Sequence, residues 1–410
     1  MSGTRLVVIP LTLLWLASCD TGRDGAAPGE PAGFAGLGEE AGDFAQAHEG
    51  ITLRFPEDHA AHPDYRIEWW YLTANLEDDR GEPLGLQWTL FRQALTPPGE
   101  RPESTPWAAD QLWMAHMAVS RGETHRVAER FARSHSDDDL EERDGQAGAR
   151  AEPFRAWIDH WQLASHIETS DETSDDEPDT DTFDELELTA HQDDEYGGFG
   201  YDLTLTAEGP LVLHGENGFS QKSADGQGSM SSGSMSSGSM SSGSMYYSQP
   251  FWRIEGEVTL DGETRTVSGR GWLDREWSSQ LLGAEQRGWD WFSLHLDSGY
   301  KLMAFRLRGG ATDGGDYRSG TWISPEGEPT ALTPDEIHME PLGTRQAAGR
   351  EVPTRWRLEI PRAELDLIVE APHAERWMDT SVPYWEGEVV ARDADSGENR
   401  GVGYLEMTDY

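Results

Sequence analysis

The sequence predicts an all-β fold made of two tandem antiparallel β-barrels or sandwiches. Short segments rich in aromatic and β-branched residues recur along the chain, turn residues separate them, and long stretches with helical periodicity are missing. A low-complexity segment over 226–245 separates two strand-rich halves of similar length. We therefore predict one β-domain over 51–225 and a second over 246–410.

The first half begins with a predicted β-hairpin. Residues 66–76 and 84–95 are aromatic and β-branched, and they flank a Gly-containing turn at 78–81. Residues 111–120 predict a third strand, and shorter strand segments follow. Residues 121–133 carry the short helix that we predict in this half.

Two segments are predicted surface loops. Residues 166–185 are dominated by Asp, Glu, Ser and Thr, and residues 226–245 repeat Ser-Met-Ser-Ser-Gly. The alternative for the second segment is a soft-copper site formed by its evenly spaced thioethers, Met230, Met235, Met240 and Met245. Because no His or Cys accompanies them, we favour the loop and predict no metal site.

Composition limits the partners. The chain has 76 acidic and 32 basic residues and a formal net charge of −44, which disfavours nucleic acid and anionic membrane surfaces. Only two of the basic residues are lysines, Lys222 and Lys301. This acid-rich, Lys-poor composition fits a protein that stays soluble in high salt; the alternative is an acidic face for a cationic partner.

The N-terminus predicts a lipoprotein. Arg5 precedes an apolar stretch over 6–16 that is too short to span a bilayer, and Cys19 follows in a sequence that resembles a bacterial lipobox. We predict a signal peptide over 1–18, a lipid-bearing Cys19 and a flexible tether over 19–50, which places the protein on the periplasmic side of the inner or outer membrane. The alternative is an ordinary secretory signal.

The most distinctive stretch is 269–280. Residues two apart on a strand share a face, so Trp272, Asp274 and Glu276 point the same way. In a dry aromatic interior, Asp274 is expected to be protonated and able to deliver a proton to a carbon–carbon double bond, after which water adds. The alternative is a structural Asp274 that pairs with Arg275 or Arg270.

Seventeen tryptophans predict an aromatic ligand site. Adjacent residues such as Trp69 and Trp70 must point to opposite faces of a strand, so one of each pair faces a barrel interior or an interface. Aromatic-lined barrels suit elongated apolar small molecules. The predicted ligand-binding residues are Trp70, Trp88, His116, Trp252, Trp289 and Trp291. For His116, a hydrogen-bonded core histidine is the alternative.

Other chemistries have weaker support. Asp58, His59 and His62 offer a zinc-like His-x-x-His pair, but the adjacent proline favours a polar loop that caps the next strand. Serine hydrolysis would rest on Ser278 or Ser279, and the sequence has no G-x-S-x-G motif. It has no phosphate loop or dinucleotide fingerprint, and we predict no cofactor.

Seven segments resemble the lipocalin-like superfamily that contains carotenoid 1,2-hydratases and AttH-type secreted proteins, with the AttH branch the more similar. They are Glu68-Trp-Trp-Tyr71, Gly85-Leu-Gln-Trp-Thr-Leu-Phe-Arg92, Ala115-His-Met-Ala118, Tyr246-Tyr-Ser-Gln-Pro250, Gly271-Trp-Leu-Asp-Arg-Glu-Trp-Ser278, Gly288-Trp-Asp-Trp-Phe-Ser293 and Gly403-Tyr-Leu-Glu406. The resemblance implies two tandem lipocalin-like antiparallel β-barrels. It also implies a cofactor-free acid-catalysed hydration in the hydratase branch, with Asp274 as proton donor beside Trp272. The hydratase motif Tyr-His-Asp-His-Asn reads Trp272-Leu-Asp-Arg-Glu276 here, so Arg275 and Glu276 replace the flanking His and Asn.

These observations predict an envelope lipoprotein that binds an apolar or amphipathic ligand. The AttH resemblance implies a setting near an ABC-type export system and its permease. The first alternative is a cofactor-independent hydratase that uses Asp274, and the second is a secreted esterase.

Overall fold

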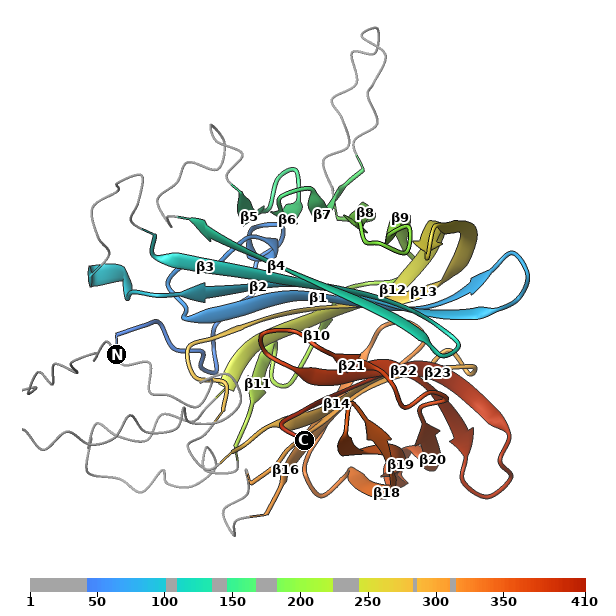
Figure 1. Ribbon diagram of the computed structural model, residues 1–410. Helices are drawn as coiled ribbons and strands as arrows, with labels where there is room; N and C mark the ends of the chain where they lie inside the picture. Colours follow the sequence, from blue (N-terminus) through green and yellow to red (C-terminus); the bar gives the residue numbers. More distant parts are fainter. Residues whose placement is uncertain are drawn as a thin grey trace, which may run out of the picture. The chain divides into compact units, whose positions relative to one another are not determined.

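Two curved antiparallel sheets hold nearly all the regular structure of the computed structural model, which describes residues 43–100, 109–134, 146–166, 183–223, 243–282, 286–309 and 315–410. Both sheets belong to one compact unit, Pro31–Tyr410, and Figure 1 shows them stacked on one another. The all-β prediction of two tandem barrels is confirmed. Among the described residues, no helix is long and apolar enough to cross a bilayer.

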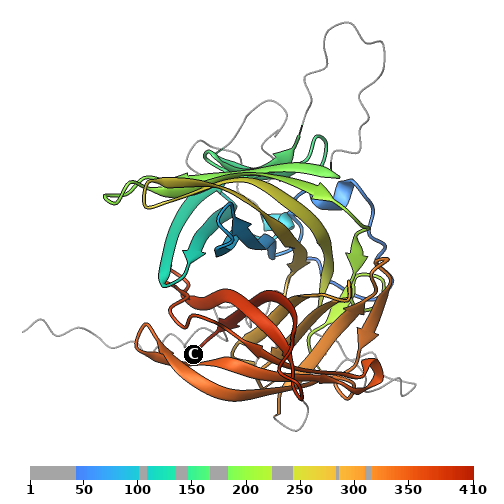
Figure 2. The same cartoon turned by 90° about the vertical axis from the view of Figure 1, so that its right-hand side faces the viewer.

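The first sheet has the strand order β4-β3-β2-β1-β13-β12-β9-β8-β7-β6-β5, with β10 and β11 paired to β12. Its strands are β1 (Ile67–Asp78), β2 (Pro83–Ala94), β3 (Gln111–Arg121), β4 (Thr124–Ser134), β5 (Ala147–Arg150), β6 (Arg155–Ile158), β7 (Trp161–Ser165), β8 (Glu185–Gln192), β9 (Phe199–Ala207), β10 (Val212–Leu213), β11 (Phe219–Gln221), β12 (Gly243–Leu260) and β13 (Glu263–Ser278). The end strands β4 and β5 lie beside each other, so the sheet nearly closes into a barrel (Figure 2).

The second sheet has the order β17-β16-β15-β14-β23-β22-β20-β19-β18, with β21 paired to β22. Its strands are β14 (Trp289–Leu296), β15 (Lys301–Leu307), β16 (Tyr317–Ile323), β17 (Pro329–Leu332), β18 (His338–Ala347), β19 (Arg350–Ile360), β20 (Leu365–Glu370), β21 (Trp377–Met378), β22 (Tyr384–Asp393) and β23 (Asn399–Thr408). Three short 3₁₀ turns complete the described structure: η2 (Glu57–His59), η3 (Pro98–Glu100) and η5 (Pro361–Ala363).

The helix predicted over 121–133 is wrong. Gly122 adopts a φ of +54°, which allows a tight turn after β3, and the chain returns as β4 in register with β3. The conformation of this charged segment is therefore determined by its pairing with β3 and not by its local sequence pattern.

The change of sheet does not coincide with the predicted division at 226–245. The two longest strands, β12 and β13, follow that segment in sequence, yet they pair with β9 and β1 of the first sheet. The chain enters the second sheet only between Ser278 and Trp289. The predicted loop over 226–245 lies outside the described residues except for its end, where Met245 is buried in β12.

Three of the five apolar clusters among the described residues matter for the site. One fills the first barrel and includes Leu72 and Trp88, and another fills the second barrel around Trp356. A third lies between the sheets and includes Tyr71 and Trp272. Because successive residues of β1 and β13 face opposite sides, each strand contributes side chains both to the core of the first barrel and to the space between the sheets.

Candidate functional site

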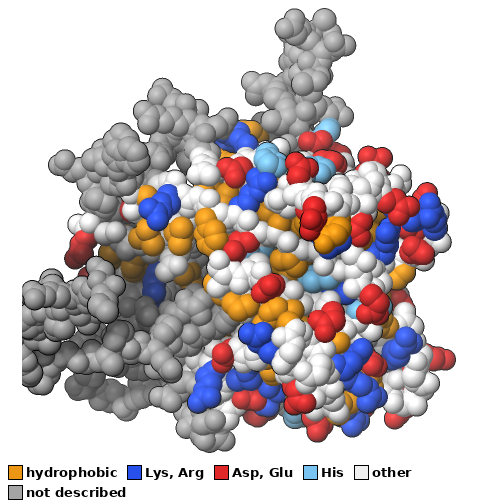
Figure 3. Space-filling view, in the orientation of Figure 1, with side chains coloured by type: hydrophobic (Ala, Val, Ile, Leu, Met, Phe, Trp, Pro, Cys, Tyr) orange, Lys and Arg blue, Asp and Glu red, His pale blue; other side chains and the backbone are white. Residues whose placement is uncertain are grey.

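A cavity of about 310 Å³ lies between the two sheets rather than inside either barrel. Strands β1, β2, β3 and β13 supply one wall, and β14, β15 and β23 supply much of the other. Its aromatic lining includes Trp69, Tyr71, Phe91, Trp289, Trp291 and Phe305. Phe131, on β4, is 46% exposed at the rim, and Figure 3 shows apolar side chains exposed among charged ones at the level where the sheets meet.

The predicted ligand-binding residues separate into two groups. His116, Trp289 and Trp291 line the cavity. The other three pack in the core of the first barrel, where they are almost fully buried: Trp70, Trp88 and Trp252. The reason is strand alternation, because Trp69 rather than Trp70 faces the space between the sheets.

Asp274 lies in the cavity wall and is only 2% exposed. Trp272 Nε1 donates a hydrogen bond to Asp274 Oδ1 at 2.6 Å, and the Ser248 hydroxyl contacts the same oxygen. The Tyr246 hydroxyl lies 2.5 Å from Oδ2. Burial raises the pKa of Asp274 to about 7, although these three hydrogen bonds act in the opposite direction. The carboxyl group is therefore protonated in an appreciable fraction of molecules at neutral pH.

The hydrogen-bond partners place this proton on Oδ2. An indole N–H can only donate, so Oδ1 must accept from Trp272. The Tyr246 hydroxyl donates to Oδ2 when the carboxyl group is ionised, and its oxygen can accept from Oδ2 when the group is protonated. Trp291 Nε1 donates to the same Tyr246 oxygen at 3.1 Å. Trp272 thus holds the carboxyl group in position without lining the cavity itself.

Ser248→Ala is expected to raise the pKa of Asp274. The Ser248 hydroxyl lowers this pKa, and His214 Nε2 lies 2.5 Å from the hydroxyl and holds it in place. Losing one hydrogen bond of about 1 kcal/mol corresponds to a rise of roughly one pH unit. NMR titration of the Asp274 carboxyl carbon measures the shift. The control is Ser278→Ala, because Ser278 of β13 is buried like Ser248 of β12 but donates to the Gly243 carbonyl.

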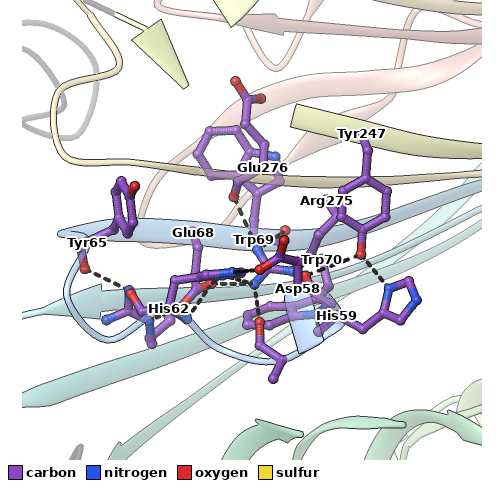
Figure 4. A network of polar contacts seen from close by, with 12 residues as sticks. Asp58, His59, His62, Tyr65, Glu68, Trp69, Trp70, Tyr247, Arg275 and Glu276 are labelled. Carbon is purple, nitrogen blue, oxygen red and sulfur yellow. Dashed lines mark hydrogen bonds and ion pairs between the residues drawn. The ribbon is translucent and has the colours of Figure 1, made fainter. Parts of the chain in front are cut away.

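Arg275 does not pair with Asp274, so the predicted ion pair between them is wrong. Its guanidinium lies on the other face of β13, 3.7 Å from the Trp70 ring centre, and forms an ion pair with buried Glu68 (Figure 4). Glu68 also pairs with Arg92. The other proposed partner, Arg270, is exposed to solvent. Neither of the two cations expected to pair with a structural Asp274 therefore does so.

Further ionisable groups from distant segments meet at the cavity. Lys222 Nζ lies 2.7 Å from Glu276. Burial raises the pKa of Glu406 to about 8, against a hydrogen bond from Trp289, and nearby Asp274 and Glu276 add to the rise. Sequence reasoning missed Lys222 and Glu406 as site residues. The one sequence signal for Glu406 is its position in the Gly403–Glu406 segment that carries the family resemblance.

The polar loop before β1 supports the capping interpretation. His62 contacts Asp58 at 3.1 Å and Glu68 at 3.2 Å, and the His62 backbone N–H donates to Glu68 (Figure 4). Nowhere in the described part of the chain do three or more His, Cys, Asp or Glu residues form a group suited to a metal ion. Cys19 and three of the four methionines considered for copper, Met230, Met235 and Met240, lie outside the described residues.

The candidate serines are structural. Ser278 donates to the Gly243 carbonyl and Ser279 to the Ala45 carbonyl, so neither hydroxyl is aligned with a base. Ser248 lies between His214 and Asp274, whereas a Ser–His–Asp triad requires the histidine in the middle.

Comparison with known proteins gives a family and a fold. The family model described as AttH-like matches residues 46–410. An AttH protein from Nitrosomonas europaea is 31% identical, covers 90% of this chain and 99% of its own, and superposes with a TM-score of 0.71. Kievitone hydratase from Nectria haematococca is 15% identical, covers 89% and 95%, and has a TM-score of 0.58, which shows a shared fold. No match was found among curated proteins.

Proposed function

The chain belongs to the AttH-like family, and we propose that it is a cofactor-independent hydratase that adds water across a carbon–carbon double bond of an apolar or amphipathic substrate. One observation carries this proposal: Asp274 is a buried acid with a pKa of about 7 in the wall of an aromatic cavity, and no cation pairs with it among the described residues. A general acid works best when its pKa lies near the operating pH.

The reaction balances without a cofactor. Asp274 Oδ2 gives its proton to one alkene carbon, and the electron pair of the double bond forms the new C–H bond. The cation left on the other carbon faces Tyr71, the cross-strand neighbour of Asp274, and Trp291, whose ring centre lies 5.3 Å from that of Tyr71. Water then forms the C–O bond, and its surplus proton returns to the Asp274 carboxylate, which restores the acid.

We propose that Glu406 binds and positions the attacking water molecule. It lines the same cavity from the second sheet and is directly opposite Trp291 in the β14–β23 pairing. With a pKa of about 8, its carboxyl group is mainly neutral at pH 7 and can both donate to and accept from a water molecule. A structural neighbour named kievitone hydratase agrees with this class of reaction; at 15% identity it supports the fold, and the reaction rests on the acid site.

Isotope labelling tests the proposal. Trisubstituted alkenes such as geraniol and farnesol give a tertiary cation on protonation, so they are suitable first substrates in water enriched in heavy oxygen. We expect the wild type to form a labelled alcohol and Asp274→Asn to form it roughly 10²–10⁴ times more slowly. Equal rates in the two proteins would refute the role of Asp274.

The second candidate is a carrier, and the three hydrogen bonds to Asp274 favour it because each stabilises the ionised carboxylate. In this proposal a lipid on Cys19 holds the protein at the periplasmic side of a membrane, and the cavity passes an apolar ligand to an ABC-type permease. If the protein is a carrier, Asp274→Asn should bind ligand as tightly as the wild type, and Trp291→Ala should bind it more weakly. The wild type should then yield no labelled product. Loss of palmitate incorporation in Cys19→Ala tests the anchor.

A further inference from the structure

A row of polar residues crosses the wall of the cavity, one residue on each of the four adjacent strands β13, β1, β2 and β3. The pairing registers place Asp274 of β13 opposite Tyr71, Tyr71 opposite Thr89, and Thr89 opposite His116. All four side chains line the cavity. His116 is in turn opposite Glu129 of the edge strand β4. The acid and the histidine therefore mark the two ends of the row.

The spacing of strands gives the length of this row. Neighbouring strands are about 4.8 Å apart, so the three steps from Asp274 to His116 span no more than about 14 Å along the sheet. An elongated molecule can therefore contact Asp274 and the His116 end at the same time. Most of the surface between and around the two ends is apolar, as the aromatic lining indicates.

Hydrogen bonds fix the donors and acceptors at the far end. Glu129 Oε1 lies 3.1 Å from His116 Nε2, so the proton of neutral His116 is on Nε2 and Nδ1 is an acceptor. Burial lowers the pKa of His116 and keeps the ring neutral. The Tyr384 hydroxyl lies 3.0 Å from Nδ1 and donates to it. Gln87 Nε2 also donates to the Tyr384 oxygen, at 3.3 Å, so one lone pair of this oxygen remains to accept from a ligand.

Thr89 supplies the complementary donor. Its hydroxyl oxygen accepts from Gln87 Nε2 at 2.5 Å, and its own hydrogen meets no acceptor in the described part of the chain. Gln87 Oε1 is buried without a partner. Exchanging the oxygen and nitrogen of the Gln87 amide would give the Thr89 hydroxyl an acceptor, but the amide nitrogen would then have no acceptor of its own. In either orientation, one hydrogen-bonding group of this cluster therefore has no partner. Buried groups of this kind are normally satisfied.

We infer that Thr89 and Tyr384 bind a hydroxyl group on the substrate, at the opposite end of the molecule from the double bond that Asp274 protonates. A hydroxyl can donate to the Tyr384 oxygen and accept from Thr89 at once. A carboxylate is disfavoured because Glu386 and Glu129 lie near Tyr384 and the cluster contains no cation. An ammonium is disfavoured because Thr89 offers a donor. This inference rests on the proposed hydratase function and names its substrate class: an elongated apolar alkene with a terminal hydroxyl.

Competitive displacement of the neutral fluorescent probe N-phenyl-1-naphthylamine tests the inference on the full chain. The ligands are farnesol, farnesyl methyl ether, farnesoic acid and farnesylamine, which share one hydrocarbon chain and differ in the terminal group. We expect the wild type to bind farnesol about tenfold more tightly than the ether, which has lost the donor, and more tightly than the charged analogues. Tyr384→Phe should reduce the farnesol-to-ether ratio to about one, with little change in affinity for the ether. Thr89→Val should weaken the binding of both ligands by a similar factor, because the ether oxygen can still accept from Thr89.

Thr73→Val is the matched control, since Thr73 is a buried β1 residue on the same face that does not line the cavity. It should keep the wild-type ratio. An unchanged ratio in Tyr384→Phe, or unchanged affinity for both ligands in Thr89→Val, with wild-type melting temperatures, would overturn the inference. Tighter wild-type binding of the acid or the amine would also overturn it. Asp274→Asn separates this inference from the proposed function, because it should keep the farnesol preference even if no hydration is observed in any protein.

Discussion

Asp274→Asn is expected to make the protein more stable above neutral pH while it slows the proposed hydration roughly 10²–10⁴-fold. The folded state binds a proton at Asp274 with a pKa of about 7, whereas the ordinary value is 3.8. Above pH 7 the wild type must therefore keep an ionised carboxylate in a dry cavity. An asparagine retains an acceptor for Trp272 and offers its NH₂ group to Tyr246, so it mimics the protonated acid at every pH.

The direction in which stability changes with pH follows from the number of protons bound by the folded and unfolded states. Between pH 4 and pH 7 the folded state holds more protons than the unfolded state, so stability falls as the pH rises. The stabilisation from the protonated acid is complete below pH 4 and is lost as the pH passes through 7. The difference in unfolding free energy between the wild type and Asp274→Asn should change by about 4 kcal/mol between pH 4 and pH 8, in favour of the variant at high pH.

Urea denaturation of both proteins at a series of pH values measures this difference. Asp78→Asn is a control of opposite sign, because backbone hydrogen bonds from Glu82 and Arg80, together with Arg265, lower the pKa of Asp78. It should lose stability at neutral pH. A pH-independent difference between the wild type and Asp274→Asn would show that Asp274 titrates normally, and the hydratase proposal would then lose its acid.

The sequence predicts the face of Asp274 but not its surroundings. Alternation along β13 is a local property, so the shared face of Trp272, Asp274 and Glu276 could be inferred from spacing alone. The cavity depends on which face of each strand the second sheet covers, and this is a long-range property. The sequence therefore predicts ligand contacts for Trp70 and Trp88, although both side chains fill the first barrel. Residues such as Lys222 and Glu406 could not be connected with the site because they lie far from Asp274 in sequence.

The alternative in which Asp274 pairs with Arg275 is wrong for a similar reason. Adjacent residues on a strand point to opposite faces, so proximity in sequence to Asp274 argues against contact. The true partner, Glu68, is more than two hundred residues away and becomes adjacent only when β1 pairs with β13. The segments 68–71 and 271–278, both of which carry the family resemblance, thus form one structural unit in which Asp274 faces the cavity and Arg275 packs on Trp70 on the opposite face.

Glu68→Gln is expected to destabilise the protein by about 3–5 kcal/mol, the usual cost of leaving buried charges without their partner. Glu68 is 1% exposed and pairs with both Arg92 and Arg275, and it accepts the His62 backbone N–H at 2.9 Å. Burial acts to raise the pKa of Glu68, but the two guanidinium groups outweigh it and hold the pKa well below 4.5. The network therefore needs a carboxylate at this position, and glutamine leaves two buried cations unneutralised.

Arg275→Met is the comparison that separates the two faces of β13. It leaves the Glu68–Arg92 pair in place, so its loss of stability should be smaller than that of Glu68→Gln when both are measured by urea denaturation at pH 7. Because Arg275 faces away from the cavity, the pKa of Asp274 should stay near 7 in this variant, as measured by carboxyl-carbon NMR. A shift of Asp274 by more than about one pH unit would mean that Arg275 acts on the acid across the sheet, and the separation of a structural face from a chemical face would fail.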